Sequence, residues 1–367
     1  MKRGFILIGL ATIILFIILF ILYYNSIFAR NSIEKLIQNK KMINVLIAGS
    51  NVFNDNKHQF YGILSINPEN ERIGFTIIPP NLTISIDSRS KALQRISQID
   101  INNFKKLSTF LNQKLQLNIP FYIELYSPDV ERLVDIIEGI DLYVIYQIDE
   151  IDGIEYGLNY FDGMKTIKYI NSAEENSIFI KYDRIQDILL TLFYNKNKYK
   201  KYVNIKLISE ALKTIKTNLV PQEAMTIIDL LYKKSDLICA ILPGQYNDGF
   251  LHFDDISYKI YEKEFLTKLV FNNEIESSMK VKILNGSGIS GMARKMRNLL
   301  VREGLNVVEF GTSPYPIIDH SIIINQKGDI GAVKRVSELI GVNRIYHIID
   351  NMQLSSVLLI VGKDFAR

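Results

Sequence analysis

The stretch VKILNGSGISGMARKMRNLL, residues 281–300, joins an apolar β-forming run to a glycine-rich turn and a helix-like segment. Gly286, Gly288 and Gly291 have the G-x-G-x-x-G spacing of the dinucleotide-binding fingerprint. Glu309 closes the next strand-like run, about where an acid that binds a ribose would stand. The pattern predicts a compact β-α-β unit, and it raises the question of whether the turn binds NAD.

Downstream of this unit the same alternation continues to the end of the chain. Two strand-like runs, HSIIINQ (320–326) and RIYHIID (344–350), flank a helical pattern at 329–341, and SSVLLIVG (355–362) follows. The polar segment ESSMK (276–280) precedes the whole set. We therefore expect a small α/β domain at residues 276–367.

Upstream, residues 43–270 also alternate between strand and helix patterns, which favours an α/β fold with α–β–α layers. The run at 60–78 predicts a hairpin around a Pro-Glu-Asn-Glu turn. Ser127 is expected to cap a helix with Pro128 at its first position and Glu131 in a capping role. Further strands are expected at 43–49, 121–126, 141–148 and 237–244, and further helices at 102–117, 163–171, 183–194, 204–216, 221–234 and 256–274.

The N-terminus has the strongest physical signal. Phe5 to Tyr24 is almost entirely apolar, and about 20 helical residues span roughly the 30 Å of a bilayer core. The run is longer than a signal-peptide core and lacks a small-x-small cleavage site, so we expect a membrane anchor at residues 1–29. Cations flank both ends, so charge does not decide the orientation. The single large domain that follows favours residues 30–367 outside the membrane.

Composition excludes several classes of site. The net charge of +4 is small for 367 residues and does not favour a dedicated nucleic-acid binder. Cys239 is the only cysteine, which excludes an intrachain disulfide and a cysteine-based zinc site. The four histidines are scattered without metal-ligand spacing. No metal or cofactor is expected from these residues.

Several ordered blocks resemble the LytR–CpsA–Psr family of cell-envelope proteins. The blocks are NVLIAGSN (44–51), YGILSINPENERIGFTIIPPN (61–81), FYIELYSPDVERLVDIIEGIDLYV (121–144), GLNYFDGMKTIKYI (157–170) and YDRIQD (182–187), with 280–365 resembling the family's regulator C-terminal domain. The resemblance implies a cytoplasmic tail, one membrane span and an extracytoplasmic domain at 30–275. An extracytoplasmic domain has no access to NAD, so we interpret Gly286, Gly288 and Gly291 as a tight turn between strand and helix. The N-terminus of that helix retains the alternative of holding an anionic group.

The resemblance also implies transfer of a glycopolymer from a polyprenyl-pyrophosphate carrier to peptidoglycan. That chemistry needs arginines for the pyrophosphate, carboxylates for a divalent metal such as Mg²⁺, and an apolar cleft for the lipid. The chain departs at most of these positions. The two acids become Asn51 and Gln59, the Pro-Arg-Asp motif becomes Pro80-Asn81, and the second arginine of the Arg-x-x-Arg pair becomes Asp187, while Arg184 is kept.

We therefore expect a vestigial lipid- or phosphate-binding cleft without catalytic residues, built from Arg184, Asn51, Lys57, Gln59 and Asn81. Lys57, Arg89, Lys91 and Lys181 are the cations that would substitute for the missing charges, although ordinary solvated surface charges have the same pattern.

The segment FYNKNKYKKY (193–202) interleaves lysine and tyrosine. This pattern is compatible with binding of nucleic acid or anionic lipid, but it is more typical of a solvated helix end, which is the interpretation we favour.

Three functions remain open at this point. The first is a non-catalytic envelope protein that binds cell-wall glycan or a polyprenyl-phosphate carrier. The second is an active phosphotransferase with substituted residues and Mg²⁺, and the third is a scaffold that binds another envelope protein. Transcriptional attenuation is a weaker fourth idea, since no helix-turn-helix pattern is evident. A long apolar channel behind Arg184 would favour the first two functions over a scaffold.

Overall fold

The computed structural model describes residues 17, 31–50, 60–85, 93–98, 104–146, 148, 151–172, 178–247, 250–270 and 279–366. The predicted anchor at residues 1–29 lies outside this part of the chain, apart from Ile17. None of the helices in the described ranges is long and apolar enough to cross a membrane. The membrane anchor stays a prediction.

A six-stranded sheet in the order β10-β3-β2-β1-β6-β9 forms the centre of the larger domain. The strands are β1 (Ile43–Ser50), β2 (Phe60–Ile66), β3 (Arg72–Ile78), β6 (Phe121–Tyr126), β9 (Lys216–Thr217) and β10 (Asp236–Ile241). The predicted hairpin at 60–78 is confirmed, because β2 and β3 pair antiparallel with Ile63 opposite Thr76. In contrast, β6 joins β1 and β10 joins β3 in parallel. Most of the sheet is buried on both faces, as the long apolar runs of β1 to β3 indicate.

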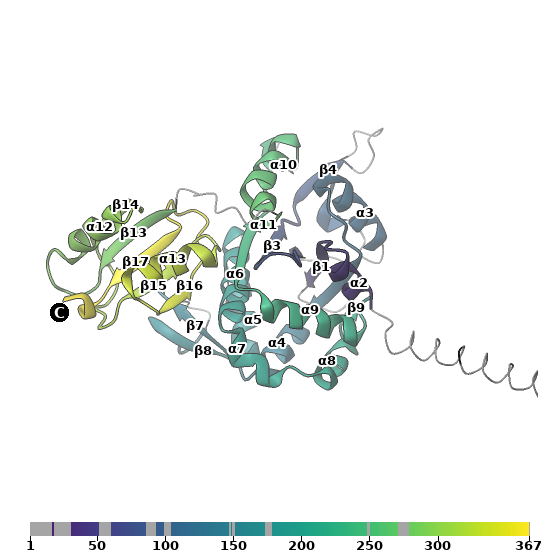
Figure 1. Cartoon of the computed structure of the whole chain (residues 1–367), viewed down its shortest axis with the longest axis horizontal. Helices are drawn as coiled ribbons and strands as arrows, with labels where there is room; N and C mark the ends of the chain where they lie inside the picture. Colours follow the sequence, from purple (N-terminus) through teal and green to yellow (C-terminus); the bar gives the residue numbers. More distant parts are fainter. Residues whose placement is uncertain are drawn as a thin grey trace, which may run out of the picture.

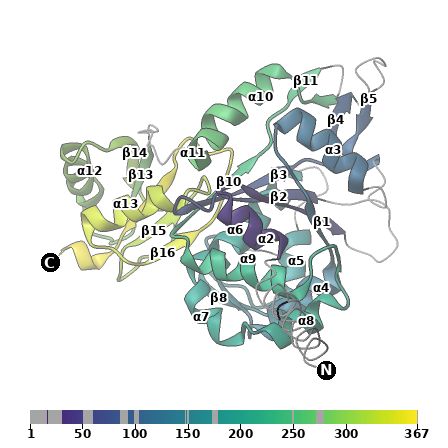
Figure 2. The ribbon, with the colours of Figure 1, turned by 45° about the vertical axis from the view of Figure 1, so that its right-hand side comes forward.

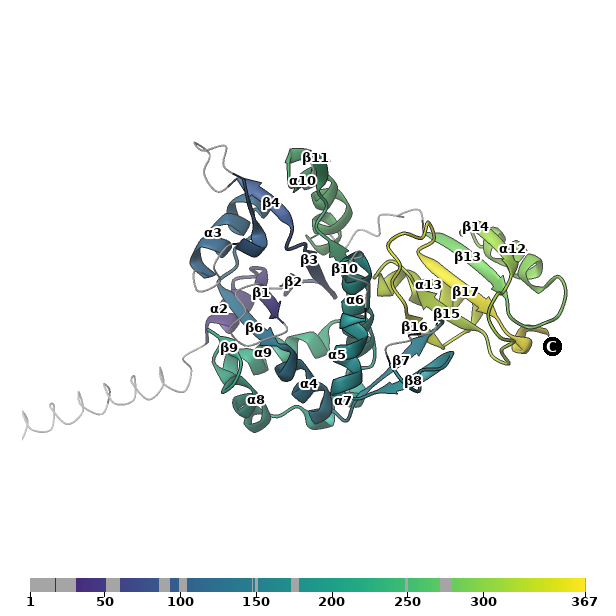
Figure 3. The same ribbon diagram turned by 180° about the vertical axis from the view of Figure 1, so that it is seen from behind.

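Helices cover both faces of this sheet, which confirms the expected α/β fold (Figures 1 and 3). On one face, α3 (Phe104–Leu115), α10 (Asp255–Tyr261), the π-helical turn η4 (Glu262–Leu266) and α11 (Thr267–Val270) pack against alternate residues of the strands, such as Leu46 and Ile63. On the other face lie α2 (Ser32–Gln38), α6 (Ile178–Tyr194) and α9 (Pro221–Lys233), which contact the intervening residues Val45 and Phe75. The alternation follows from the two-residue period of a strand.

A side layer extends the domain beside α6. It contains the hairpin of β7 (Ile140–Val144) and β8 (Gly157–Phe161), together with α4 (Ser127–Ile136) and α5 (Gly163–Asn171). The predicted cap of α4 is wrong by one residue. The helix begins at Ser127 and its N-cap is Tyr126, whose backbone N–H donates to the Asp129 carboxylate at 3.0 Å. Asp129 therefore takes the capping role that was expected of Glu131.

Shorter elements complete the larger domain. A second sheet has the order β11-β12-β4-β5, with β4 (Leu82–Ser85), β5 (Leu93–Arg95), β11 (Gln245–Asn247) and β12 (Phe250–His252). The remaining helical segments are η1 (Ile96–Gln98), α7 (Lys196–Tyr199), η3 (Lys200–Tyr202) and α8 (Ile205–Leu212).

The C-terminal domain is a five-stranded sheet in the order β14-β13-β17-β15-β16 with two helices. Its elements are β13 (Lys280–Asn285), α12 (Met292–Arg302), β14 (Asn306–Thr312), β15 (Ile322–Asn325), α13 (Ile330–Ile340), β16 (Ile345–His347), β17 (Val357–Val361) and η5 (Lys363–Ala366). The β-α-β unit predicted from residues 281–300 is confirmed, since β13 and β14 pair in parallel around α12.

The two domains pack closely against each other, with α13 beside β10 and β16 beside α6 (Figures 1 and 2). Ile330 and Ile349 of the C-terminal domain are buried in the same apolar cluster as α6 and α9. The backbone N–H of Cys239 on β10 donates to Gly328 O at 2.9 Å, so a C-terminal loop covers part of this sheet edge. The C-terminal domain thus completes the core of the larger domain.

Candidate functional site

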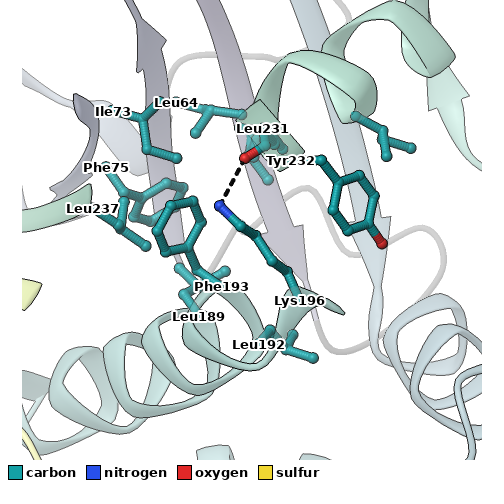
Figure 4. A pocket seen from close by; sticks show the side chains of 12 residues that line it. Leu64, Ile73, Phe75, Leu189, Leu192, Phe193, Lys196, Leu231, Tyr232 and Leu237 are labelled. Atoms are coloured by element: carbon teal, nitrogen blue, oxygen red, sulfur yellow. Dashed lines mark hydrogen bonds between the residues drawn. The ribbon is translucent and has the colours of Figure 1, made fainter. Parts of the chain in front are cut away.

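An apolar cavity of about 250 Å³ lies between the central sheet, α6 and α9 (Figure 4). Its size is slightly below the roughly 300–1,000 Å³ of common small-molecule sites. Side chains from four strands and three helices line it: Ile47, Leu64, Ile73, Phe75 and Leu237 from the sheet, Leu189, Leu192 and Phe193 from α6, Ile228, Leu231 and Tyr232 from α9, and Lys196 from α7. The lining suits a hydrocarbon chain better than a polar ligand.

Lys196 is the one cation among the residues that line this cavity. Its Nζ lies 4.0 Å from the centre of the Phe193 ring, and it donates to Leu231 O at 3.0 Å and to Lys234 O. These carbonyls belong to the end of α9, where backbone acceptors lack helical partners. Burial lowers the pKa of Lys196 to about 8. Lys196 therefore stabilises the end of α9 and also places a cation at an apolar cavity.

The expectation of a solvated helix end at 193–202 is wrong for Lys196, whereas other lysines of the segment are exposed. Lys198 pairs with Asp141 at 2.6 Å, and Lys201 lies 3.8 Å from Glu138. Sequence reasoning missed Lys196 because the lysines share one local pattern. The signal that distinguishes Lys196 is its position three residues after Phe193, which lies on the apolar face of α6.

Arg184 is buried in α6 but faces α5 and is not among the residues that line the cavity. Its Nη1 donates to Tyr169 O at 2.9 Å and to Ser172 Oγ, and the guanidinium lies 5.1 Å from the centre of the Tyr169 ring. Its Nε is buried and has no hydrogen-bond partner among the described residues. The first α6 residue that lines the cavity, Leu189, lies between one and two turns after Arg184. The cavity is therefore on a different face of α6 from the one that carries Arg184.

Asp187 contacts the C-terminal domain. One carboxyl oxygen accepts the backbone N–H of Ile349 at 2.6 Å, and the other accepts the hydroxyl of Tyr169 at 2.6 Å. Burial raises the pKa of Asp187 to about 8, although both donors and Arg184 act in the opposite direction. One turn earlier, Asp183 accepts the backbone and side-chain N–H groups of Asn351. The acidic residue at the position of the expected second arginine therefore anchors the two domains to each other.

The other predicted cleft residues are only partly described. Asn81 lies in the turn after β3, and its Oδ1 is buried without a hydrogen-bond partner among the described residues. Asn51, Lys57 and Gln59 lie outside the described residues, as do Arg89 and Lys91. The strands on either side of the segment that contains Asn51, Lys57 and Gln59 are paired, with Gly49 of β1 opposite Phe60 of β2. Lys181 donates to Asn171 Oδ1 at 3.1 Å.

The described residues contain no cluster of carboxylates that could hold a divalent metal ion. No group of three or more His, Cys, Asp or Glu side chains there is placed to hold a metal ion. The one described residue at the family's acidic positions is Asn81, a neutral amide that binds Mg²⁺ poorly on its own. Asn81 by itself does not fit a Mg²⁺ site.

The glycine turn at 286–291 satisfies its own polar groups. The N–H of Ser287 donates to Asn285 Oδ1, the N–H of Ile289 donates to Ser287 Oγ, and Asn285 Nδ2 donates to Ile289 O. Gly291 has φ of 84° at the N-cap of α12, a conformation that favours glycine. Two N–H groups that a phosphate would need are thus already used, and Glu309 pairs with Lys282 at 2.8 Å. The geometry is that of a tight turn between strand and helix.

Comparisons with known proteins agree with this architecture. Residues 278–365 match the family model of the LytR cell envelope-related transcriptional attenuator. The structure of TagT bound to LIIa-WTA aligns at a TM-score of 0.53 and 13% identity, over 63% of this chain and 91% of TagT. TagV of B. subtilis aligns at 0.51 and 16% identity, over 63% of this chain and 98% of TagV. TagT bound to LI-WTA aligns at 0.52 and 14% identity, over 64% and 92% of the two chains.

These structural matches cover more of the chain than the C-terminal domain contains, so they include the fold of the larger domain. No curated protein matches the sequence. The predicted resemblance to LytR–CpsA–Psr proteins is confirmed by sequence for the C-terminal domain, and the larger domain shares the fold of TagT and TagV.

Proposed function

We propose that this chain is a membrane-anchored, extracytoplasmic protein of the cell envelope that binds a polyprenyl-phosphate carrier, or the wall glycan attached to it, without transferring the glycan. The observation that carries the proposal is the apolar cavity between the sheet, α6 and α9. A prenyl chain gains free energy on leaving water for such a lining, at roughly 25 cal/mol per Å² of apolar surface. The fold shared with TagT bound to LIIa-WTA gives further support.

Loss of transfer chemistry is supported by the roles of two α6 residues. Transfer needs cations that bind the pyrophosphate, and each lost charged contact costs about 1.5–3 kcal/mol. Asp187 instead joins the two domains. The guanidinium of Arg184 donates to Tyr169 O of α5 and to Ser172, the C-cap of α5. Asn81 adds a neutral amide where the family has a charged pair.

The test is mass spectrometry of the lipids that co-purify with the full chain from a bacterial membrane fraction. Ile228→Phe fills the cavity, and Ile205→Phe makes the same change at an exposed position of α8 as the matched control. We expect polyprenyl phosphate with the native chain and the control, and at least tenfold less with Ile228→Phe. Absence of the lipid from all three samples would reject lipid binding.

Arg184→Ala separates headgroup binding from tail binding. If Arg184 contacts the phosphate, less polyprenyl phosphate should co-purify with this variant than with the native chain. If Arg184 only supports α5, the amount of co-purifying lipid should be unchanged. A transfer assay with carrier-linked glycan and peptidoglycan fragments should show no product with the native chain. Product formation would favour the active phosphotransferase instead.

A further inference from the structure

A second cavity of about 300 Å³ lies on the C-terminal domain, between α12 and η5, and shares no lining residue with the cavity in the larger domain. Its lining combines apolar and cationic side chains. The cavity is lined by Met292, Lys295, Met296, Asn298, Leu299, Arg302 and Phe365. The turn at Gly286–Gly291 and the proposed lipid cavity do not account for this feature.

The floor and the rim of this cavity come from two adjacent stripes of α12. Met292 and Met296 are buried, and Leu299 and Phe365 are half-buried, so the floor is apolar and contains two flexible thioethers. Lys295 and Arg302 are exposed and stand seven residues apart on one side of the helix, about 10 Å along its axis. The site therefore offers an apolar floor beside two separated cations.

The rim cations are available to a ligand. The side chain of Lys295 forms no hydrogen bond or ion pair with any described residue, and among these residues Arg302 has only an exposed contact at 3.9 Å with Glu303. On η5, the carboxylate of Asp364 accepts from Ser321, and Lys363 pairs with Asp319. The sequence of α12, MARKMRNLLVR, has four cations and no acid. Charge complementarity therefore points to an acidic partner.

We propose that this cavity binds an acidic peptide segment of a partner protein, with an apolar side chain on the methionine floor and carboxylates at Lys295 and Arg302. A hydroxyl-rich glycan would leave the floor unused, because polar groups gain nothing from an apolar surface. A lipid surface is disfavoured by position. The helix α12 lies at the opposite end of the molecule from α2, which follows the predicted membrane anchor (Figures 1 and 3).

The experiment measures fluorescence anisotropy of a labelled peptide of alternating aspartate and leucine with the full chain in detergent. The double variant Lys295→Gln, Arg302→Gln should bind about five- to tenfold more weakly, as expected for two exposed ion pairs. The control double variant Arg294→Gln, Arg335→Gln removes the same charge from exposed positions outside the cavity and should bind as the native chain does.

Three further probes decide between occupants. A peptide of alternating aspartate and glycine should bind more weakly than the leucine peptide, since it lacks the apolar contact. Equal binding of these two peptides would overturn the proposal, and so would equal losses in the two double variants. Tighter binding of inorganic polyphosphate, or of vesicles with anionic lipid, that depends on Lys295 and Arg302 would assign the cavity to a polyanion or a membrane and reject the peptide.

Discussion

Two faces of the helix α6 have different surroundings: one lines the apolar cavity and the other contacts the C-terminal domain. Leu189, Leu192 and Phe193 line the apolar cavity, where space remains between the side chains. Asp183 and Asp187 point to the C-terminal domain, where their carboxyl groups accept the backbone N–H groups of Asn351 and Ile349. A binding cavity needs unfilled apolar volume, whereas a fixed domain contact needs buried polar groups with partners. The comparison shows that one helix combines both because its side chains diverge by about 100° per residue.

The largest expected effect comes from removing the acceptors at the domain contact. Asp187→Ala leaves Ile349 N and the Tyr169 hydroxyl buried without their acceptor, which should cost about 2–4 kcal/mol of unfolding free energy. Urea denaturation of the full chain measures it. Asp229→Ala, at an exposed position of α9, is the control and should change stability by less than about 0.5 kcal/mol. Equal stability of both variants would show that the contact contributes nothing.

The second effect is the pH dependence of the same contact. The folded pKa of Asp187 is raised to about 8 by burial, so the folded state holds a proton that the unfolded state releases near pH 4. Stability should therefore fall as pH rises from 6.5 to 8, by about 1–2 kcal/mol. His347, with a pKa lowered to about 3 by burial, acts with the opposite sign below pH 6.5, which is why the window starts there.

The pH series is best compared with Asp187→Asn, which keeps the size of the side chain and cannot titrate. Its stability should be nearly flat between pH 6.5 and 8. A parallel decline in the native chain and the variant would assign the pH dependence to another group.

At the cavity face, we expect a smaller effect from Lys196→Met. The variant removes the donors to Leu231 O and Lys234 O but also removes a cation whose burial is unfavourable. A net loss of about 1 kcal/mol is expected near pH 7. Because the folded pKa is lowered to about 8, the native chain gains stability above pH 8, as the lysine loses its charge, and the variant should lack this gain. Thermal denaturation at pH 7 and pH 9.5 tests both statements.

An effect of similar size concerns aromatic contacts at the edge of the domain interface. Tyr143 of β7 stacks on Tyr346 of β16, with ring centroids 4.3 Å apart. Tyr143→Leu keeps apolar area but removes the ring pair, which should cost about 0.5–1.5 kcal/mol. Coupling to Tyr346→Leu in a double-mutant cycle isolates the pair, and additive losses would mean that the two rings do not interact.

Much of the fold was predictable from local pattern. The hairpin at 60–78 and the β-α-β unit around α12 follow from period-two and helical apolar spacing with glycine or proline at the turns. Boundaries shifted where capping is decided by contacts, as at Tyr126 and Asp129. The candidate site was less predictable, since neither Lys196 nor Arg184 has its expected surroundings: the lysine lines the apolar cavity, and the arginine is buried against α5.

By itself, the sequence determined the alternation of strands and helices and the tight turn at Gly286–Gly291, because these depend on residues close together in the chain. Its resemblance to an envelope family depends on ordered local blocks for the same reason. Only the tertiary structure decided that Asp187 joins two domains, that Lys196 enters an apolar cavity, and that α12 carries a cationic rim beside methionines. Each of these roles depends on the direction of a side chain relative to an element distant in sequence, such as Ile349 for Asp187 or Leu231 for Lys196. Local periodicity gives the face of a helix but not what packs against it.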